Sequence, residues 1–319
     1  MSRSPFALPV RLLLDNVRRA NFIPLHRLDV SAARAAYAAG VGAMTQPPPP
    51  VPRVLNFSMP LAGGARPARL WSTQTDTTRA QPVLLYLHGG GFVVGGLSTC
   101  DALCRELATA SGAAVVAVDY RKCPEHALAD AFDDAWHALQ WLAWQGHTLG
   151  LDGQRLAVAG DSAGGTLAAT VALMARDAGL PLALQAMFYP SVQTRLTTES
   201  FHLYGDEGLV DQELMAWFDR HAAAHSLPRE AWHREPLFAP SHDRVAPAWI
   251  GLAECDMLTS EGQAYAHALE AAGVPVTLQT WPGMIHDFIN MSRFLPAARE
   301  AQQSLAAALG QALGTRLAR

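Results

Sequence analysis

The sequence predicts an α/β fold: a mostly parallel central sheet with helices on both faces. Two observations indicate this fold. From residue 82 onward, short apolar runs typical of buried strands alternate with longer helical stretches, and the motifs that could carry chemistry come directly after strands. Parallel strands joined through helices are covered on both sides, so they read as continuous apolar runs. With 319 residues, half of them apolar, the chain is long enough to bury such a core.

The expected elements follow in order along the chain. Helices over 6–20 and 29–40 come first, the second after a candidate N-cap at Ser31, and a stiff connector over 46–52 contains four consecutive prolines. The expected strands are 53–59, 67–73, 82–87, 113–118, 155–160, 183–188, 246–253 and 275–281. The expected helices between and after them are 98–111, 129–145, 162–178, 259–272 and 296–314.

Residues 191–238 interrupt this alternation. The segment is polar and has one amphipathic stretch, residues 212–224. We therefore expect a main domain formed by residues 53–190 and 239–319, preceded by N-terminal helices and a proline linker over 1–52. A surface excursion without a role is the alternative interpretation of the inserted segment.

Ser162 occupies the turn between an expected buried strand and an expected helix, within Gly160-Asp161-Ser162-Ala163-Gly164-Gly165. A serine in that position presents its hydroxyl at the carboxyl edge of the sheet. The flanking glycines remove side chains that would clash in the turn. This context indicates a nucleophilic serine. Asp161 beside it is expected either to fix the surrounding loops or to support catalysis indirectly.

A second glycine-rich turn, His88-Gly89-Gly90-Gly91-Phe92, follows the expected strand 82–87. Its backbone amides could point into a cleft. Acyl transfer needs such donors because the carbonyl oxygen becomes an oxyanion, and removing one donor typically slows the reaction roughly 100- to 1000-fold. A flexible loop without chemical importance is the alternative, which the nearby serine turn makes less favourable.

An acid and a base follow two later strands. Asp256 comes just after the strand 246–253, and His286 follows the strand 275–281. The order Ser162, Asp256, His286 is that of a triad built on an α/β-hydrolase sheet. His286 would take the proton of the serine hydroxyl and return it to the leaving group, while Asp256 would orient the imidazole and stabilise its charged form.

Some assignments have competitors. Glu254, Glu261 and Asp287 are alternatives for the acid, and a favourable charge near a helix N-terminus explains Glu261 at least as well as catalytic support. His221 and His225 are four residues apart on an expected helix, but no glutamate accompanies them in an HExxH arrangement, so we expect a solvated face and no metal site.

These motifs resemble those of the bacterial hormone-sensitive-lipase-like carboxylesterases in the α/β-hydrolase superfamily, from about residue 53 onward. The matching segments are residues 88–92, 119–126, 160–165, 256–262 and 283–286. The resemblance implies that the amides of Gly90, Gly91 and Ala163 bind the oxyanion and that His88 supports its loop. It also implies that the N-terminal helices and the insertion 191–238 form a helical cap over the active site.

The resemblance implies a serine carboxylesterase that needs no cofactor or metal. It favours small-molecule esters with short to medium acyl chains, because a cap narrows access. Four aromatic residues either line the pocket or belong to the core: Phe92, Phe188, Trp217 and Phe218. An amide, formamide or lactone hydrolase with the same triad is the alternative. A non-catalytic ligand-binding relative is a more remote one, since the triad is intact. Similar esterases dimerise through the outer strand, so a homodimer fits the resemblance.

The sequence departs from the family pattern at a few positions. Lys122, the only lysine, and Cys123 replace leucine and alanine, and Met257 replaces the proline or valine that often follows the acid. Asp287 stands where glycine usually follows the catalytic histidine, so its carboxylate could change the pKa of His286 or the shape of the acyl pocket.

Charge and cysteine usage limit the partners and the setting. The net charge of −4 without long charge runs does not indicate a nucleic-acid partner. The four cysteines lack zinc-ligand spacing, and their number does not suggest a disulfide scaffold. Neither a signal peptide nor an apolar run of membrane-spanning length is apparent, which predicts a cytoplasmic protein without stable membrane association.

Overall fold

The computed structural model describes residues 5–195, 197–223 and 230–315, and the strands in these ranges form one eight-stranded sheet. The order across the sheet is β1-β2-β4-β3-β5-β6-β7-β8. β2 is antiparallel to both β1 and β4, and all other neighbours are parallel. The strands are β1 (Arg53–Met59), β2 (Arg66–Ser72), β3 (Gln81–Leu87), β4 (Ala114–Val118), β5 (Leu151–Asp161), β6 (Leu184–Phe188), β7 (Ala248–Ala253) and β8 (Val276–Trp281).

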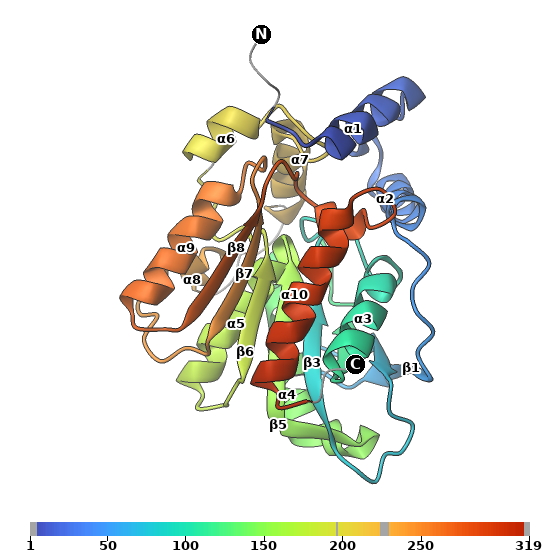
Figure 1. Ribbon diagram of the computed structural model, residues 1–319. Coiled ribbons are helices and arrows are strands. Elements are labelled where there is room, and N and C mark those ends of the chain that lie inside the picture. The colour runs from blue at the N-terminus through green and yellow to red at the C-terminus, as the bar shows by residue number, and fades with distance from the viewer. Residues whose placement is uncertain (1–4, 196, 224–229, 316–319) are drawn as a thin grey trace.

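Helices cover both faces of this sheet (Figure 1). α3 (Leu97–Ser111) and α10 (Pro296–Ala312) pack on one face, and α4 (Leu128–Gln145), α5 (Ala163–Asp177) and α9 (Thr259–Ala271) pack on the other. Alternate residues of the fully buried central strands point to opposite faces and build two apolar layers. This arrangement confirms the predicted α/β fold class.

Four further helices lie at the end of the sheet where β7 and β8 finish (Figure 1). They are α1 (Leu8–Ala20), α2 (Val30–Met44), α6 (Glu199–Tyr204) and α7 (Gln212–Ala222). Hydrogen bonds attach the first two to the loops that follow strands: the Ala7 amide donates to the Gly283 carbonyl (3.1 Å), and Arg34 Nε donates to the Val93 carbonyl (2.8 Å). His26 Nε2 lies 2.9 Å from Glu213 Oε2, which connects the N-terminal segment with α7.

The expected elements are present with small shifts in their bounds. Ser31 is not the N-cap of α2: Asp29 occupies that position and accepts the amide hydrogen of Ala32, so the helix begins at Val30. Asp29 precedes the first helical residue, as a cap must, whereas Ser31 is already inside the first turn. The sequence analysis also missed α6 and α8 (Ala231–Arg234), which are too short to show a helical period. The last residue of the helix expected over 212–224 lies outside the described residues.

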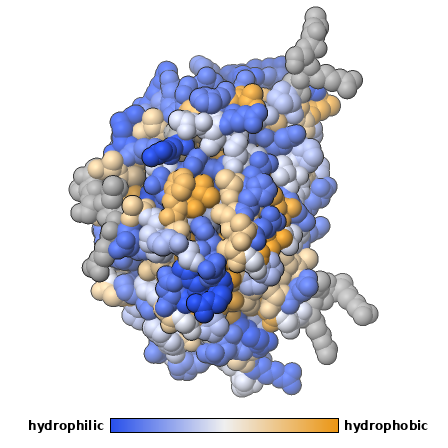
Figure 2. Space-filling view, turned by 90° about the vertical axis from the view of Figure 1, so that its left-hand side faces the viewer, coloured by the Kyte–Doolittle hydropathy of each residue, from blue (hydrophilic) through white to orange (hydrophobic). Residues whose placement is uncertain are grey.

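The described ranges contain no helix that could span a membrane. None of the helices found there combines the length and the apolar composition that a bilayer crossing requires. On the face in Figure 2, apolar side chains gather near the middle and are surrounded by hydrophilic ones.

A buried carboxylate on α4 fixes the segment after β4, which supports the site described below. Asp134 is fully buried, and its Oδ2 accepts hydrogen bonds from Arg66 Nε (3.0 Å), Arg121 Nε (2.9 Å) and the Arg121 amide (3.0 Å). In the same segment, the Tyr120 hydroxyl donates to the His88 carbonyl at 2.7 Å. The α4 carboxylate is therefore connected to the glycine-rich loop after β3.

Replacing Asp134 with asparagine should lower the free energy of unfolding by about 2–4 kcal/mol, because Arg66 loses its counter-charge and Arg121 keeps only its pair with Asp130. Urea unfolding followed by tryptophan fluorescence measures this change. The matched control is Asp133→Asn, since Asp133 is an exposed neighbour on the same helix and its replacement should change stability by less than about 0.5 kcal/mol. Equal stability of the two variants would contradict the proposed importance of the buried carboxylate.

Candidate active site

The turn that carries Ser162 is tight and conformationally unusual. Ser162 has φ 53° and ψ −121°, which is strained for a residue with a side chain, and its amide donates to the Phe188 carbonyl at 2.9 Å. Two residues later, a Cβ at Gly164 would lie 2.0 Å from the Leu87 carbonyl oxygen. Only glycine therefore lets the start of α5 approach the end of β3. The turn holds the serine hydroxyl at the carboxyl edge of the sheet.

The structure brings Ser162, His286 and Asp256 together through two hydrogen bonds. His286 Nε2 lies 2.9 Å from Ser162 Oγ, and His286 Nδ1 lies 2.7 Å from Asp256 Oδ2. The other carboxylate oxygen of Asp256 accepts the amide hydrogen of Leu258 at 3.0 Å. Because Nδ1 must donate to the carboxylate, Nε2 of neutral His286 accepts the hydroxyl hydrogen.

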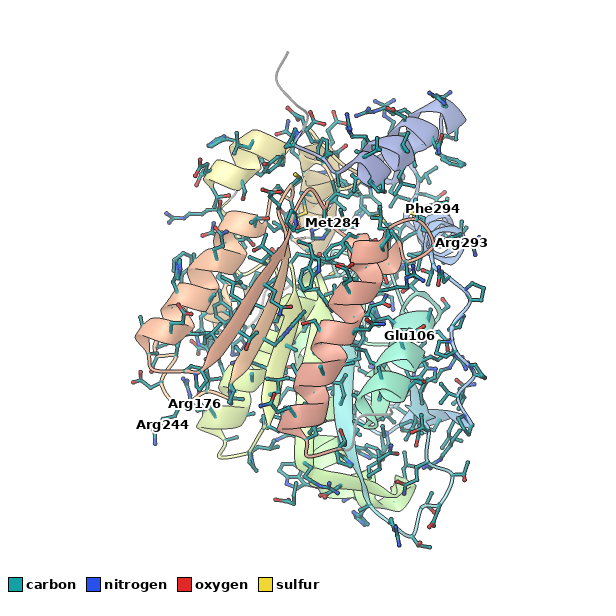
Figure 3. All side chains as sticks on the ribbon, viewed as in Figure 1. Glu106, Arg176, Arg244, Met284, Arg293 and Phe294 are labelled. Atoms are coloured by element: carbon teal, nitrogen blue, oxygen red, sulfur yellow. The ribbon has the colours of Figure 1, made fainter. Side chains whose placement is uncertain are left out.

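The loops that carry Asp256 and His286 are bound to each other. The Cys255 amide donates to the Met284 carbonyl at 2.8 Å, and the Gly283 amide donates to Glu254 Oε2 at 2.7 Å. Met284 lies in the loop after β8 (Figure 3). These bonds set the distance between the residues that follow β7 and those that follow β8. They also give Glu254 a role other than the catalytic acid.

The charges around His286 favour its protonated form. Burial lowers the pKa of this imidazole, but the charge and hydrogen bond of Asp256 outweigh burial, with smaller contributions from Asp287 and Asp161. The net result is a pKa of His286 above its ordinary value. The site therefore stabilises an imidazolium at the place where the serine proton would arrive.

Three backbone amides beside the serine turn are free to donate. The amides of Gly90, Gly91 and Ala163 have no hydrogen-bond partner within the part of the chain that the structure describes. Ala163 is the first residue of α5, where a helix leaves its amides unpaired. Gly90 and Gly91 have φ 116° and 58°, a region that favours glycine. Both glycines are half-buried.

Asp161 and His88 hold the glycine-rich loop in place. Asp161 Oδ1 accepts hydrogen bonds from the Gly89 amide (3.0 Å) and the Tyr86 hydroxyl (2.7 Å). Burial raises the pKa of the Asp161 carboxyl. His88 Nδ1 donates to the Gly89 carbonyl at 2.8 Å, and its ring stacks on Tyr120 with centroids 4.3 Å apart. Neither side chain is hydrogen-bonded to Ser162 or His286.

The remaining acid candidates, Glu261 and Asp287, form no hydrogen bond with His286. Glu261 is buried, accepts the amide hydrogen of Val192 at 2.8 Å, and has no hydrogen bond to His286. Burial is the main reason that the pKa of Glu261 rises to about 8. The hydrogen bond to Val192 places Glu261 beside the start of the inserted segment. Asp287 is hydrogen-bonded to Tyr37 and Asn290 instead of the imidazole nitrogens.

Lys122 and Cys123, two other departures from the family pattern, lie in the segment that packs beside the glycine loop. Lys122 Nζ binds Asp119 and donates to the Tyr120 carbonyl at 3.3 Å. Burial opposes ionisation of Asp119, yet His88 and Lys122 hold the pKa of this carboxyl at about 2. Cys123 is a buried free thiol whose carbonyl accepts from Arg34 Nη2 at 3.0 Å.

The aromatic candidates divide into core and site. Phe188 is fully buried and makes an edge contact with Trp249, so it belongs to the core. Phe218, on α7, lies directly against the glycine loop: a Cβ at Gly91 would be 2.2–2.4 Å from its ring atoms. Phe92 packs against Phe132, with centroids 5.8 Å apart.

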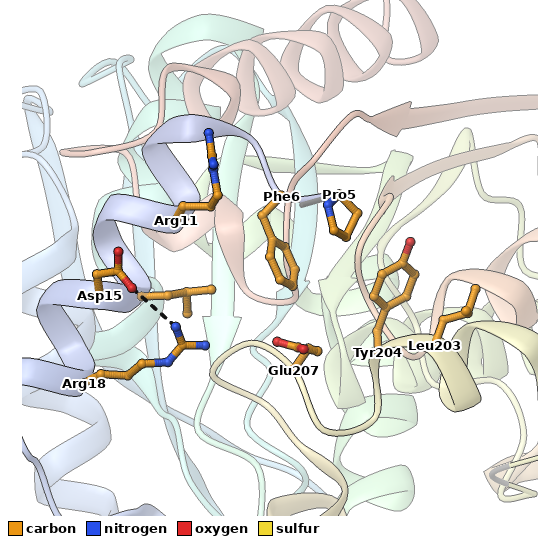
Figure 4. Close-up of a pocket in the computed structure, with 9 residues that line it drawn as sticks. Pro5, Phe6, Arg11, Asp15, Arg18, Leu203, Tyr204 and Glu207 are labelled. Atoms are coloured by element: carbon orange, nitrogen blue, oxygen red, sulfur yellow. Dashed lines mark hydrogen bonds and ion pairs between the residues drawn. The ribbon is translucent and has the colours of Figure 1, made fainter. Parts of the chain in front are cut away.

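The groove between α1 and α6 is lined by none of the expected site residues. It has a volume of about 490 Å³, with Arg11, Phe6 and Tyr204 among its walls (Figure 4). Within the described ranges, no three His, Cys, Asp or Glu side chains gather so that they could hold a metal. His225, half of the histidine pair considered above, is outside those ranges.

Sequence reasoning missed Tyr37, whose hydroxyl donates to Asp287 Oδ2 at 3.3 Å. The two residues are 250 positions apart, and an isolated tyrosine in an alanine-rich helix gives no local signal. The departure from the family pattern at Asp287 is the sequence feature that indicates a further contact beside His286.

The chain is similar to known proteins in sequence and in fold. Residues 84–290 match a family model whose description is "alpha/beta hydrolase fold". The chain is 36% identical to an ethyl acetate hydrolase of Pseudomonas putida, over 98% of this chain and all of that protein. It is 40% identical to a carboxylesterase of Mycobacterium tuberculosis, over 73% of this chain and 74% of that one. A thermostable esterase structure from Pseudomonas putida ECU1011 superposes with a TM-score of 0.91 at 32% identity, covering 98% of this chain and 99% of that one.

The chain belongs to the α/β-hydrolase family, in its hormone-sensitive-lipase-like branch, as the motifs predicted. Within that family it is a carboxylic ester hydrolase, an enzyme class that the sequence also predicted.

The pKa of His286 should fall by at least about one unit in Asp256→Asn, because the variant removes the charge and the acceptor that favour the imidazolium. NMR titration of the imidazole nitrogens measures this shift, and His286→Gln identifies the resonances. An unchanged pKa would contradict the electrostatic account of the site.

Proposed function

We propose that this protein is a serine carboxylesterase that cleaves small esters with short to medium acyl chains through an acyl-enzyme on Ser162. The observation that carries the proposal is the hydrogen-bonded series Ser162–His286–Asp256 beside three unpaired backbone amides. Ethyl acetate hydrolase, the name of one relative, supports small esters as the substrate class.

In the first half-reaction, Ser162 Oγ attacks the ester carbonyl carbon while Nε2 of His286 takes the hydroxyl proton. The π-electron pair of the carbonyl moves onto its oxygen. When the tetrahedral intermediate collapses, the carbonyl re-forms and the bond to the alcohol oxygen breaks. The alcohol leaves with the proton from His286, and the acyl group remains on the serine.

In the second half-reaction, water attacks the acyl-enzyme and His286 takes its proton. Collapse releases the carboxylic acid and returns the proton to Ser162 Oγ. Asp256 keeps Nδ1 protonated throughout, so Nε2 faces the reacting atoms in the correct tautomer.

The oxyanion of both intermediates would be bound by the amides of Gly90, Gly91 and Ala163. Asp161 and His88 would serve as supports, because their hydrogen bonds to Gly89 fix the loop relative to the serine turn. Glu261 would support the site indirectly, through the Val192 amide at the start of the insertion.

Residues 1–52 and 191–238 would form the cap, and residues 53–190 and 239–319 the catalytic domain. Support for this division comes from α1, α2 and α7, which contact the loops after β8 and β3. The ring of Phe218 lies against Gly91 and limits the space beside the glycine loop, which favours small substrates.

We further propose that the enzyme works in the reducing cytoplasm, since all four cysteines are buried free thiols.

Ser162→Ala should lower kcat for p-nitrophenyl acetate by about 10⁴- to 10⁶-fold, because the variant has no nucleophile. Release of p-nitrophenol from purified protein measures the loss, and the matching acetanilide distinguishes an esterase from an amidase. Ser58→Ala is the matched control, since Ser58 is exposed on β1. Turnover by Ser162→Ala within tenfold of the parent enzyme would refute the nucleophile.

Phe218→Ala should raise kcat/KM for p-nitrophenyl octanoate relative to acetate by about tenfold, because removing the ring opens space beside Gly91. A series of p-nitrophenyl esters of increasing acyl length measures the preference. Trp144→Ala is the aromatic control, since Trp144 is exposed near the end of α4. An unchanged chain-length profile would show that Phe218 does not limit the pocket.

A further inference from the structure

Asp287 is a carboxylate directly beside His286 that the mechanism above does not use. It has φ 67°, which lies in the left-handed region that favours glycine. Aspartate tolerates this conformation better than most residues with side chains. The conformation therefore allows a carboxylate here, and its contacts suggest a role.

Both carboxylate oxygens of Asp287 bind neutral donors. The Tyr37 hydroxyl, from α2, donates to Oδ2 at 3.3 Å, and Asn290 Nδ2 donates to Oδ1 at 2.6 Å. A second bond between α2 and the same loop lies close by, where Thr45 Oγ1 donates to the Asn290 carbonyl at 2.7 Å. The middle of α2, through Tyr37, and its C-cap, Thr45, are therefore both attached to the loop that follows His286.

The titratable groups that face Asp287 are Tyr37 from α2, Asp161 from the end of β5, Tyr189 after β6, and His286 on its own loop. Within the described ranges, no arginine or lysine forms an ion pair with Asp287. Burial, followed by the charge of Asp161, raises the pKa of Asp287 to about 6, while Asn290, His286 and Tyr37 act in the opposite direction. The carboxylate thus changes charge close to the range in which histidine titrates.

We propose that Asp287 is a positioning residue that holds the loop of His286 against the cap helix α2, and that its negative charge stabilises the imidazolium formed during catalysis. This inference rests on the proposed role of His286 as the general base. Asp256 acts on Nδ1 through a hydrogen bond, whereas Asp287 acts through space and through the loop. The residue therefore couples the cap to the base.

The sign of the electrostatic effect follows from the charges. Ionised Asp287 raises the pKa of His286, so removing its charge lowers that pKa. Activity requires neutral His286 in the free enzyme, so the acidic limb of the pH profile of kcat/KM follows this pKa. Loss of the charge therefore moves the acidic limb to lower pH.

In Asp287→Asn, the acidic limb of kcat/KM for p-nitrophenyl acetate should move down by about 0.5–1 pH unit, while the activity near pH 8 changes less than about tenfold. The profile is measured between about pH 4.5 and 9. Asp177→Asn, at an exposed aspartate on α5, is the matched control and should leave the limb in place. Asp287→Glu should keep the limb within about 0.2 units of the parent, because the charge remains. An acidic limb that does not move in Asp287→Asn would overturn the proposal.

Tyr37→Phe provides an independent variant if Asp287→Asn fails to fold. Removing the hydroxyl donor raises the pKa of Asp287, so the acidic limb should move in the same direction by a smaller amount. The double variant should move no further than Asp287→Asn alone, because both changes act through one carboxylate. Additive shifts, or no shift in Tyr37→Phe, would refute the coupling between α2 and the base.

The two proposals fail in different ways. If Ser162→Ala keeps its turnover, the proposed function and this inference fall together. If Ser162 and His286 are both essential but the acidic limb of kcat/KM does not move in the Asp287 and Tyr37 variants, only the proposed role of Asp287 is wrong.

Discussion

The site depends on one short series of hydrogen bonds, in which His286 joins Ser162 to Asp256 across three loops at the same edge of the sheet. Parallel strands place the carboxyl ends of β5, β7 and β8 at the same edge of the sheet, which is why residues far apart in sequence meet there. The remaining features protect this geometry. Gly164 lets α5 approach β3, and the Cys255–Met284 bond holds the loop of Asp256 against the loop of His286.

The electrostatics of the site favour positive charge on the imidazole and negative charge beside the glycine amides. Asp161, Asp256 and Asp287 all raise the pKa of His286, and in the described ranges none of the three is paired with arginine or lysine. Neutral donors such as Tyr86, Tyr37 and backbone amides satisfy these carboxylates instead. A positive charge on His286 would therefore be compensated by these carboxylates.

The sequence was sufficient for features that depend on local pattern. The strands, the serine turn and the order of the three candidate catalytic residues follow from buried apolar runs and the turns after them. Contacts that depend on tertiary packing were not predictable: Tyr37 reaches Asp287 from α2, and Phe218 reaches Gly91 from α7. The cap at Asp29 was missed because Ser31 is an equally good capping residue by type, and its position inside the first turn appears only in the structure.

The most direct test is a crystal structure of the protein after reaction with a p-nitrophenyl alkylphosphonate, a stable mimic of the tetrahedral intermediate. We expect phosphorus bonded to Ser162 Oγ, with the phosphoryl oxygen about 3 Å from the amides of Gly90, Gly91 and Ala163. Phosphorus on another residue, or a phosphoryl oxygen directed away from all three amides, would contradict the account.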